Sequence, residues 1–223
     1  MYKSFYVLLL SLFVLNACDN GAEEKMLQQK ALRAEIKLVK AAFAKYQTAV
    51  LSQDGYEAMK CLNQKTIDFY DDLLDKVRYA TQEEIEMLSD ADQMQVLAIR
   101  RFFTKELIFD LTGITLYATC VREGLNDTQY LKTMSIGQVA TKGNKAKAQM
   151  INNGKKTPIF FDFSKEENQW KIDITTTLIM TSKYLEMEAK KVDLSTRDYI
   201  LEKILQLSDE EKVEIFKPLR TRE

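Results

Sequence analysis

The side chains of this 223-residue chain that could do chemistry are carboxylates, tyrosines and three cysteines, because the chain contains no histidine. The lack of histidine excludes Ser-His-Asp and Cys-His catalysis and His-ligated zinc or iron. The sequence also has no glycine-rich phosphate loop, no Cys-x-x-Cys pair and no alternating acidic run typical of a calcium loop. We therefore predict no cofactor and no metal ion.

The chain has ten tyrosines besides its carboxylates, so acid–base chemistry by a carboxylate and a tyrosine is one catalytic mechanism that these residues allow. Asp68 is the best-placed carboxylate because two aromatic residues follow it directly, and Asp110 is a second candidate. Asp162 and Asp173 alternate out of phase with the apolar residues around them, so we expect both to point to water. A solvated surface position is the simpler interpretation for each carboxylate, and we predict no catalytic residue.

Seven aromatic residues fall on the faces of helices and strands that we expect to be buried. They are Phe43, Tyr46, Phe69, Tyr70, Phe161, Phe163 and Trp170. Their simplest role is to fill the core. If the domain is open on one side, the same residues would line an apolar pocket for a small ligand.

The first 18 residues have the pattern of an export signal. Lys3 is the only charged residue before Asp19, and the run from Phe5 to Leu15 is apolar except for Ser11. This run has the length of a signal-peptide apolar region and is shorter than the roughly 20 residues of a membrane-spanning helix. The alternative, a buried helix of a cytosolic domain, should be amphipathic, whereas this run is apolar all round.

The tetrapeptide Leu15-Asn16-Ala17-Cys18 directly follows this run and resembles the lipobox of bacterial lipoproteins, with Asn16 where Ala or Ser is more usual. The resemblance implies that Cys18 is lipidated with diacylglycerol and that residues 1–17 are removed as a signal peptide. The lipid bilayer is then a partner, and the protein is anchored in the bacterial cell envelope. Residues 18–24 are expected to form an acidic tether. Either membrane of the envelope fits these residues.

Two cysteines, Cys61 and Cys120, remain after Cys18 is assigned to the anchor. An oxidising compartment would allow them to form a disulfide, and two small buried thiols are the alternative. The formal net charge of -1 removes the electrostatic case for nucleic acid as a partner.

Apolar periodicity predicts helices over 25–51, 56–80 and 82–103, the last interrupted near Ser89. Residues 107–121 fit a helix or a strand, and we predict a helix that ends near Gly124. The pattern then changes to strict alternation, which predicts four strands within 130–176. Asn153-Gly154 is typical of a tight hairpin turn, whereas 164–169 should form a polar turn. Helices are predicted again over 177–216.

These elements predict a single α+β domain over 25–223, since the chain contains no linker, repeat or charge block. N-terminal helices (25–124) pack on a four-stranded antiparallel meander (130–176), and C-terminal helices (177–216) follow. The order resembles the nuclear-transport-factor-2-like cone fold. The local likeness lies in Gly143–Ala148, Phe161–Phe163 and Gln169–Asp173. The long helical stretch 81–124 and the helices after Thr177 depart from that fold.

Two functions follow from these expectations. The first is a membrane-anchored exported lipoprotein whose domain binds or scaffolds without catalysis, with an envelope protein or a small apolar ligand as its partner. The second, implied by the resemblance to the cone fold, is a small isomerase, dehydratase or hydrolase that uses Asp and Tyr. An open pocket that holds a carboxylate of raised pKa would favour the enzyme, and a sealed core without one would favour the binding domain.

Overall fold

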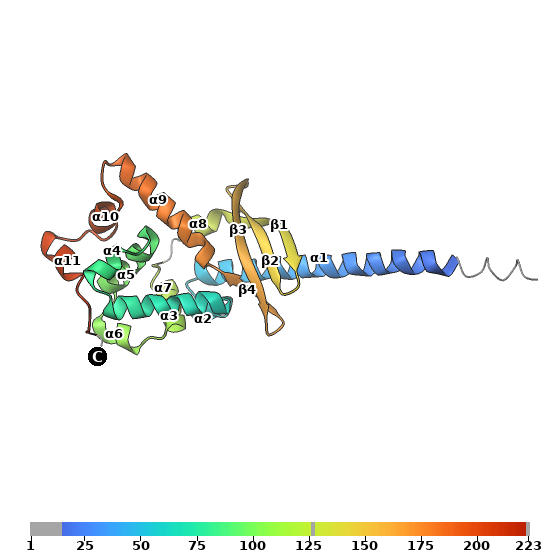
Figure 1. Cartoon of the computed structure of the whole chain (residues 1–223), viewed down its shortest axis with the longest axis horizontal. Coiled ribbons are helices and arrows are strands. Elements are labelled where there is room, and N and C mark those ends of the chain that lie inside the picture. The colour runs from blue at the N-terminus through green and yellow to red at the C-terminus, as the bar shows by residue number, and fades with distance from the viewer. Residues whose placement is uncertain (1–14, 126–127, 222–223) are drawn as a thin grey trace, which may run out of the picture.

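The computed structural model describes residues 15–125 and 128–221, and the side chains of 21–125 and 131–221. The described helices that precede the sheet are α1 (Leu15–Leu51), α2 (Gly55–Met59), α3 (Gln64–Tyr79), α4 (Gln82–Glu86), α5 (Asp90–Phe102), α6 (Lys105–Asp110), α7 (Gly113–Arg122) and α8 (Thr128–Thr133). The strands are β1 (Met134–Lys142), β2 (Lys145–Asn152), β3 (Lys155–Glu166) and β4 (Gln169–Asp173). After the sheet come η1 (Thr175–Thr177), α9 (Leu178–Lys191), α10 (Thr196–Tyr199), the π-helical turn η2 (Ile200–Ile204) and α11 (Asp209–Glu214). The α+β architecture is confirmed (Figure 1).

The sheet is the antiparallel meander β1-β2-β3-β4 that the alternating pattern predicts. Asn153 and Gly154, which join β2 to β3, have φ values of 48° and 74°, as a type I′ turn requires. The polar turn predicted over 164–169 is shorter than expected. Residues 164–166 of β3 pair with 169–171 of β4, so that only Glu167 and Asn168 form the turn.

One face of the sheet packs on α1 and forms the centre of the core. The strand residues on this face are Ala146, Ala148, Met150, Phe161, Phe163, Trp170 and Ile172, and all are buried. The helix contributes Val39, Phe43, Tyr46 and Val50, which are buried as well. The rings of Phe43 and Phe161 lie 5.2 Å apart between their centroids. The apolar residues that repeat at helical spacing along α1 therefore pack on the core from residue 39 onward.

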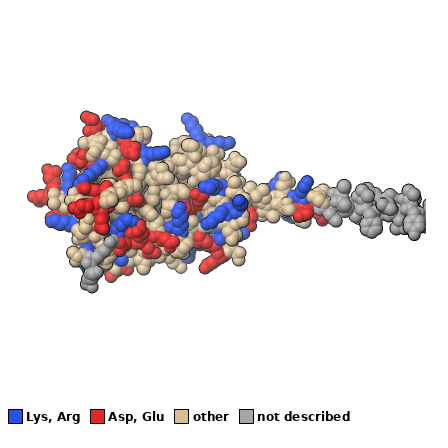
Figure 2. Space-filling model, in the orientation of Figure 1, with Lys and Arg blue, Asp and Glu red and all other residues tan. Residues whose placement is uncertain are grey.

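The first half of α1 protrudes from the domain. Every described side chain from residue 21 to residue 34 is exposed, and the helix extends alone beyond the body of the molecule (Figures 1 and 2). The packed part begins at Glu35, whose carboxylate accepts hydrogen bonds from Lys165 Nζ at 2.8 Å and Trp170 Nε1 at 2.7 Å. Residues 18–24, predicted as a tether, are helical in backbone. Among the described residues, no helix is both long and apolar enough to cross a membrane.

The helix predicted over 56–80 is divided into α2 and α3 by an extended segment that pairs with the sheet. The Asn63 amide donates to the Ile172 carbonyl at 3.0 Å, and the Ile172 amide donates to the Cys61 carbonyl at 2.8 Å. Asn63 then caps α3 by accepting from the Thr66 amide at 3.0 Å. The segment thus covers the open edge of β4, which would otherwise be exposed to other chains.

The other helix boundaries follow local signals more closely. Ser89 caps α5 and separates it from α4, as predicted. The ambiguous stretch 107–121 is helical, which confirms the choice made from the sequence, and its second helix ends at Arg122 close to Gly124. Thr112 divides this stretch by capping α7.

The C-terminal helices are fastened to the rest of the domain by Arg100 of α5, which is only 9% exposed. Its guanidinium donates to five backbone carbonyls, those of Lys76 (3.2 Å), Val77 (2.9 Å), Ala80 (2.8 Å), Ile215 (3.0 Å) and Lys217 (3.1 Å). Burial lowers the pKa of Arg100 to about 10, so it stays charged at neutral pH. The side chain therefore joins the end of α3 to the segment that follows α11.

Candidate functional site

Six of the seven aromatic residues predicted as core or pocket lining are buried, and Phe69 is half-buried. Their rings contact one another inside the domain: the centroids of Phe69 and Tyr70 lie 5.4 Å apart, in addition to the Phe43–Phe161 pair. Trp170 is held by its hydrogen bond to Glu35. The structure therefore places these residues in the packed core, the first of the two interpretations.

Tyr117 of α7 completes a buried tyrosine cluster that the sequence analysis missed. Its hydroxyl donates to the Tyr46 hydroxyl at 3.3 Å, and its ring lies 5.1 Å from that of Tyr70. Burial raises the pKa of Tyr46 to about 12 and raises the pKa values of Tyr70 and Tyr117 well above the usual value. All three hydroxyls stay protonated at neutral pH, which makes them poor general bases.

The sequence of α7 allows two different faces of the helix to be read as the buried one, and Tyr117 lies on only one of them. The apolar residues Ile114 and Ala118, four positions apart, suggest one buried face of this helix, but both are half-buried. The fully buried face of α7 instead runs through Gly113, Leu116, Tyr117 and Cys120. The spacing of 3, 1 and 3 residues is equally helical, and it would have placed Tyr117 inside.

Cys61 and Cys120 are free thiols, and both are buried, which matches the thiol alternative. Cys61 Sγ donates to the Glu57 carbonyl at 3.3 Å. Burial raises the pKa of the Cys61 thiol and raises that of Cys120 to about 12. Neither thiol forms the thiolate needed for nucleophilic chemistry at neutral pH.

Cys18 lies in the part of α1 whose side chains the structure does not describe. Residues 1–14 of the predicted signal peptide also lie outside the described residues.

None of the four candidate carboxylates forms a hydrogen bond with the tyrosine cluster in the described structure, and Asp68 and Asp110 lie on the surface. Asp68 is exposed and accepts a hydrogen bond from Gln64 Nε2 at 2.7 Å, and Asp110 is exposed as well. Asp162 points outward from the sheet, as predicted, and pairs with Lys147 at 2.9 Å.

The prediction that Asp173 points to water is wrong, since the residue is only 2% exposed. It lies on the outer face of the sheet, but β4 ends there and the chain turns back over it. Lys65 Nζ of α3 donates to its carboxylate at 2.8 Å, and the Thr175 amide and hydroxyl donate at 2.9 and 2.6 Å. The alternation of polar and apolar residues in β4 correctly places Asp173 on the outer face of the sheet. Its burial on that face depends on α3, which alternation within β4 cannot predict.

The pKa of Asp173 predicts a pH-dependent stability. Burial by itself raises this pKa, but the hydrogen bonds from Lys65 and Thr175 outweigh burial, and the net pKa is lowered. A carboxyl whose pKa is lower in the folded state stabilises the fold above the unfolded value of about 3.9 and loses that contribution as the pH falls through the folded value. We expect Asp173→Asn to lower the free energy of unfolding by about 1–2 kcal/mol at pH 7.

Urea unfolding at pH 7 and pH 3 measures this contribution. The difference between the wild type and Asp173→Asn should shrink at pH 3, because the wild-type carboxyl is then increasingly protonated. Asp162→Asn is the matched control from the same face, since its half-exposed ion pair should contribute less than about 1 kcal/mol. A difference of equal size at both pH values would contradict the assignment.

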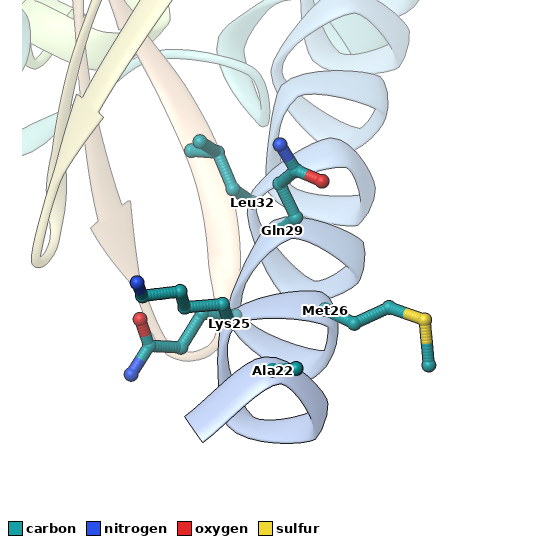
Figure 3. A pocket seen from close by; sticks show the side chains of 6 residues that line it. Ala22, Lys25, Met26, Gln29 and Leu32 are labelled. Carbon is teal, nitrogen blue, oxygen red and sulfur yellow. The ribbon is translucent and has the colours of Figure 1, made fainter. Parts of the chain in front are cut away.

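A surface hollow on the protruding part of α1 is formed by one helix. Its lining residues are Ala22, Lys25, Met26, Gln28, Gln29 and Leu32, and all of them are exposed. Figure 3 shows Met26 on the opposite side of the helix from Lys25 and Leu32. A single helix does not enclose a ligand, so this hollow is a weak candidate for a binding site.

A second hollow, of about 530 Å³, lies between α2 and α7 and is the better candidate for a binding site. Its lining residues are Gln53, Asp54, Gly55, Tyr56, Met59, Thr115, Ala118, Thr119 and Arg122. Its size is within the range of small-molecule sites. None of the seven predicted aromatic residues lines either hollow. The lining combines small residues, polar residues and one aromatic residue, Tyr56. Such a mixture follows no periodic pattern that a sequence search could detect.

The lining of the α2–α7 hollow includes apolar residues, among them Tyr56 and Met59, and the charged residues Asp54 and Arg122. Tyr56 is 62% exposed, and Lys60 Nζ lies 3.7 Å from the centroid of its ring. Asp54 accepts from the Glu57 amide at 2.9 Å, and Arg122 Nε donates to Glu123 at 3.1 Å. Such a surface can hold an apolar group against Tyr56, but its lining residues place no nucleophile beside a base.

Charges of both signs are mixed over the face of the domain seen in Figure 2. Within the described part of the chain, no three His, Cys, Asp or Glu side chains come together as metal ligands. Comparisons of the chain with models of protein families, with curated proteins and with solved structures gave no match.

Proposed function

We propose that this chain is an exported lipoprotein, anchored in the bacterial cell envelope through Cys18, whose α+β domain binds or scaffolds a partner without catalysis. The observation that carries the proposal is the tetrapeptide Leu15–Cys18 placed directly after the apolar run from Phe5. Two or three acyl chains, at about 0.8 kcal/mol per buried CH₂, hold a protein on a bilayer for long times. The partner is an envelope protein or a small apolar ligand.

The positions of the candidate catalytic groups support a binding role over an enzymatic one. An acid–base site needs a carboxylate and a tyrosine within reach of one substrate. The tyrosines Tyr46, Tyr70 and Tyr117 are enclosed in the core, whereas Asp68 and Asp110 are on the surface. Asp173 is engaged by Lys65 and has a lowered pKa, the opposite of what a general acid needs. The α2–α7 hollow is the surface we assign to ligand contact.

The mass of the N-terminal peptide, measured on protein from membranes of the native host, tests the anchor. We expect a peptide that begins at Cys18 and carries diacylglycerol and a further acyl chain. In Cys18→Ser the lipid should be lost and the protein should leave the membrane fraction. An unmodified peptide beginning at Met1, recovered from the soluble fraction, would refute the proposal.

A further inference from the structure

The amino-acid composition of the exposed part of α1 favours a helix over a flexible chain. All 13 residues from Ala22 to Ala34 are Ala, Leu, Met, Glu, Gln, Lys or Arg, which are the residues with the highest intrinsic helix propensity. The segment contains no glycine, proline, aromatic or β-branched residue. Gln28 Nε2 donates to Glu24 at 3.2 Å, one turn away. A sequence with these features is typical of a semi-rigid helical spacer.

The packed part of α1 supports the helix of the exposed part. The helix runs without a break from Leu15 to Leu51, and Glu35 fixes it to Lys165 and Trp170 of the sheet. Helix nucleation is the costly step, and each further residue adds one hydrogen bond to an existing end. Residues 21–34, although exposed all round, therefore extend a helix that the core has already formed.

We infer that the 16 residues from Asp19 to Ala34 are a rigid spacer that holds the domain at a set distance and in a set orientation above the bilayer. The inference rests on the proposed lipid anchor at Cys18. At 1.5 Å per residue, the spacer is about 24 Å long. The sheet is the end of the domain next to the spacer, whereas α4, α5, α6 and α11 lie at the far end (Figure 1). The sheet thus faces the membrane, and these helices face away from it.

The mean length alone does not distinguish a rigid spacer from a flexible linker. A flexible chain of the same number of residues has a root-mean-square length of about 20–24 Å, but it samples short distances and all orientations. Seven added residues lengthen a helix by about 10 Å and a flexible chain by only about 4 Å. The spread of distances and the response to an insertion are therefore the measurements that decide.

Trp170 is a suitable donor for these measurements, because it is the only tryptophan in the chain and lies at the base of the spacer, bonded to Glu35. The lipidated full-length protein is placed in phosphatidylethanolamine–phosphatidylglycerol vesicles that contain a dansyl-labelled lipid, and the decay of Trp170 fluorescence gives the donor-to-membrane distances. The wild type is compared with two variants. One repeats Ala22–Gln28, and the other replaces residues 22–34 by a Gly/Ser chain of equal length.

A rigid spacer should give a narrow distribution in the wild type, a shift of about 10 Å with the repeat, and a broad distribution with close approaches in the Gly/Ser variant. A wild-type distribution as broad as that of the Gly/Ser variant, in protein shown by mass to be lipidated, would overturn the spacer and leave the anchor intact. Protein without lipid on Cys18 would overturn both proposals.

Discussion

Replacement of Arg100 by methionine is expected to lower the free energy of unfolding by about 3–5 kcal/mol, one of the largest effects of any single substitution in this domain. Methionine fills a similar volume but donates no hydrogen bond. Five backbone carbonyls then lose the hydrogen bond from the guanidinium. The Lys76 carbonyl still accepts from the Ala80 amide at 3.0 Å, but a buried acceptor left without any partner costs about 1–3 kcal/mol before water re-enters. Arg100→Lys should recover only part of the loss, because an ammonium group has three donors rather than five.

Guanidinium chloride unfolding followed by circular dichroism and by Trp170 fluorescence measures the loss. Arg101→Met is the matched control, because the neighbouring arginine is 37% exposed and its 2.8 Å bond to Glu211 is a surface ion pair. Such pairs contribute about 0–1 kcal/mol. If the two variants lost the same stability, the segment after α11 would not depend on Arg100 for its position.

Replacement of Gly55 by alanine is expected to lower the free energy of unfolding by about 3 kcal/mol. Helix propensity alone predicts a gain of about 1 kcal/mol, since Gly55 is the first residue of α2. A Cβ on Gly55 would, however, lie 2.0 Å from the Ala118 carbonyl oxygen of α7. A backbone atom cannot move aside as a flexible side chain can, so α2 and α7 would have to separate.

Gly21→Ala is the control for Gly55→Ala, because a Cβ on Gly21 meets no atom within 4 Å. The same unfolding measurement should show no loss of stability in Gly21→Ala and a clear loss in Gly55→Ala. Wild-type stability in Gly55→Ala would mean that α2 moves away from α7 at little cost. The floor of the α2–α7 hollow would then be adaptable rather than fixed.

The sheet could be predicted from the sequence because its signals are local. Alternating residues such as Ala146 and Ala148 define the buried face, and Asn153-Gly154 defines a turn. The break between α2 and α3 could not be predicted in the same way. It exists because Cys61 and Asn63 pair with Ile172, more than 100 residues later in the chain. Helical periodicity depends only on residues close in sequence, so it cannot predict that contact.

The candidate site was less predictable than the fold for the same physical reason. Asp173 is a charged residue that the alternating pattern predicts to point to solvent. It is buried instead, because Lys65 and Thr175 donate hydrogen bonds to its carboxylate and cover it. The α2–α7 hollow arises where Gly55 packs directly on Ala118. Neither residue stands out in a search for chemical groups. The aromatic residues that did stand out are used to fill the core.

The position of the Arg100 acceptors in the chain has a consequence for the order of folding. Two of the five carbonyls belong to Ile215 and Lys217, 115 and 117 residues after Arg100 in the chain, whereas the other three precede it. During synthesis, the guanidinium therefore meets its α3 acceptors first and gains the other two only after the segment that follows α11 has been made. For the exported protein that we propose, this contact would form only after that segment has crossed the membrane.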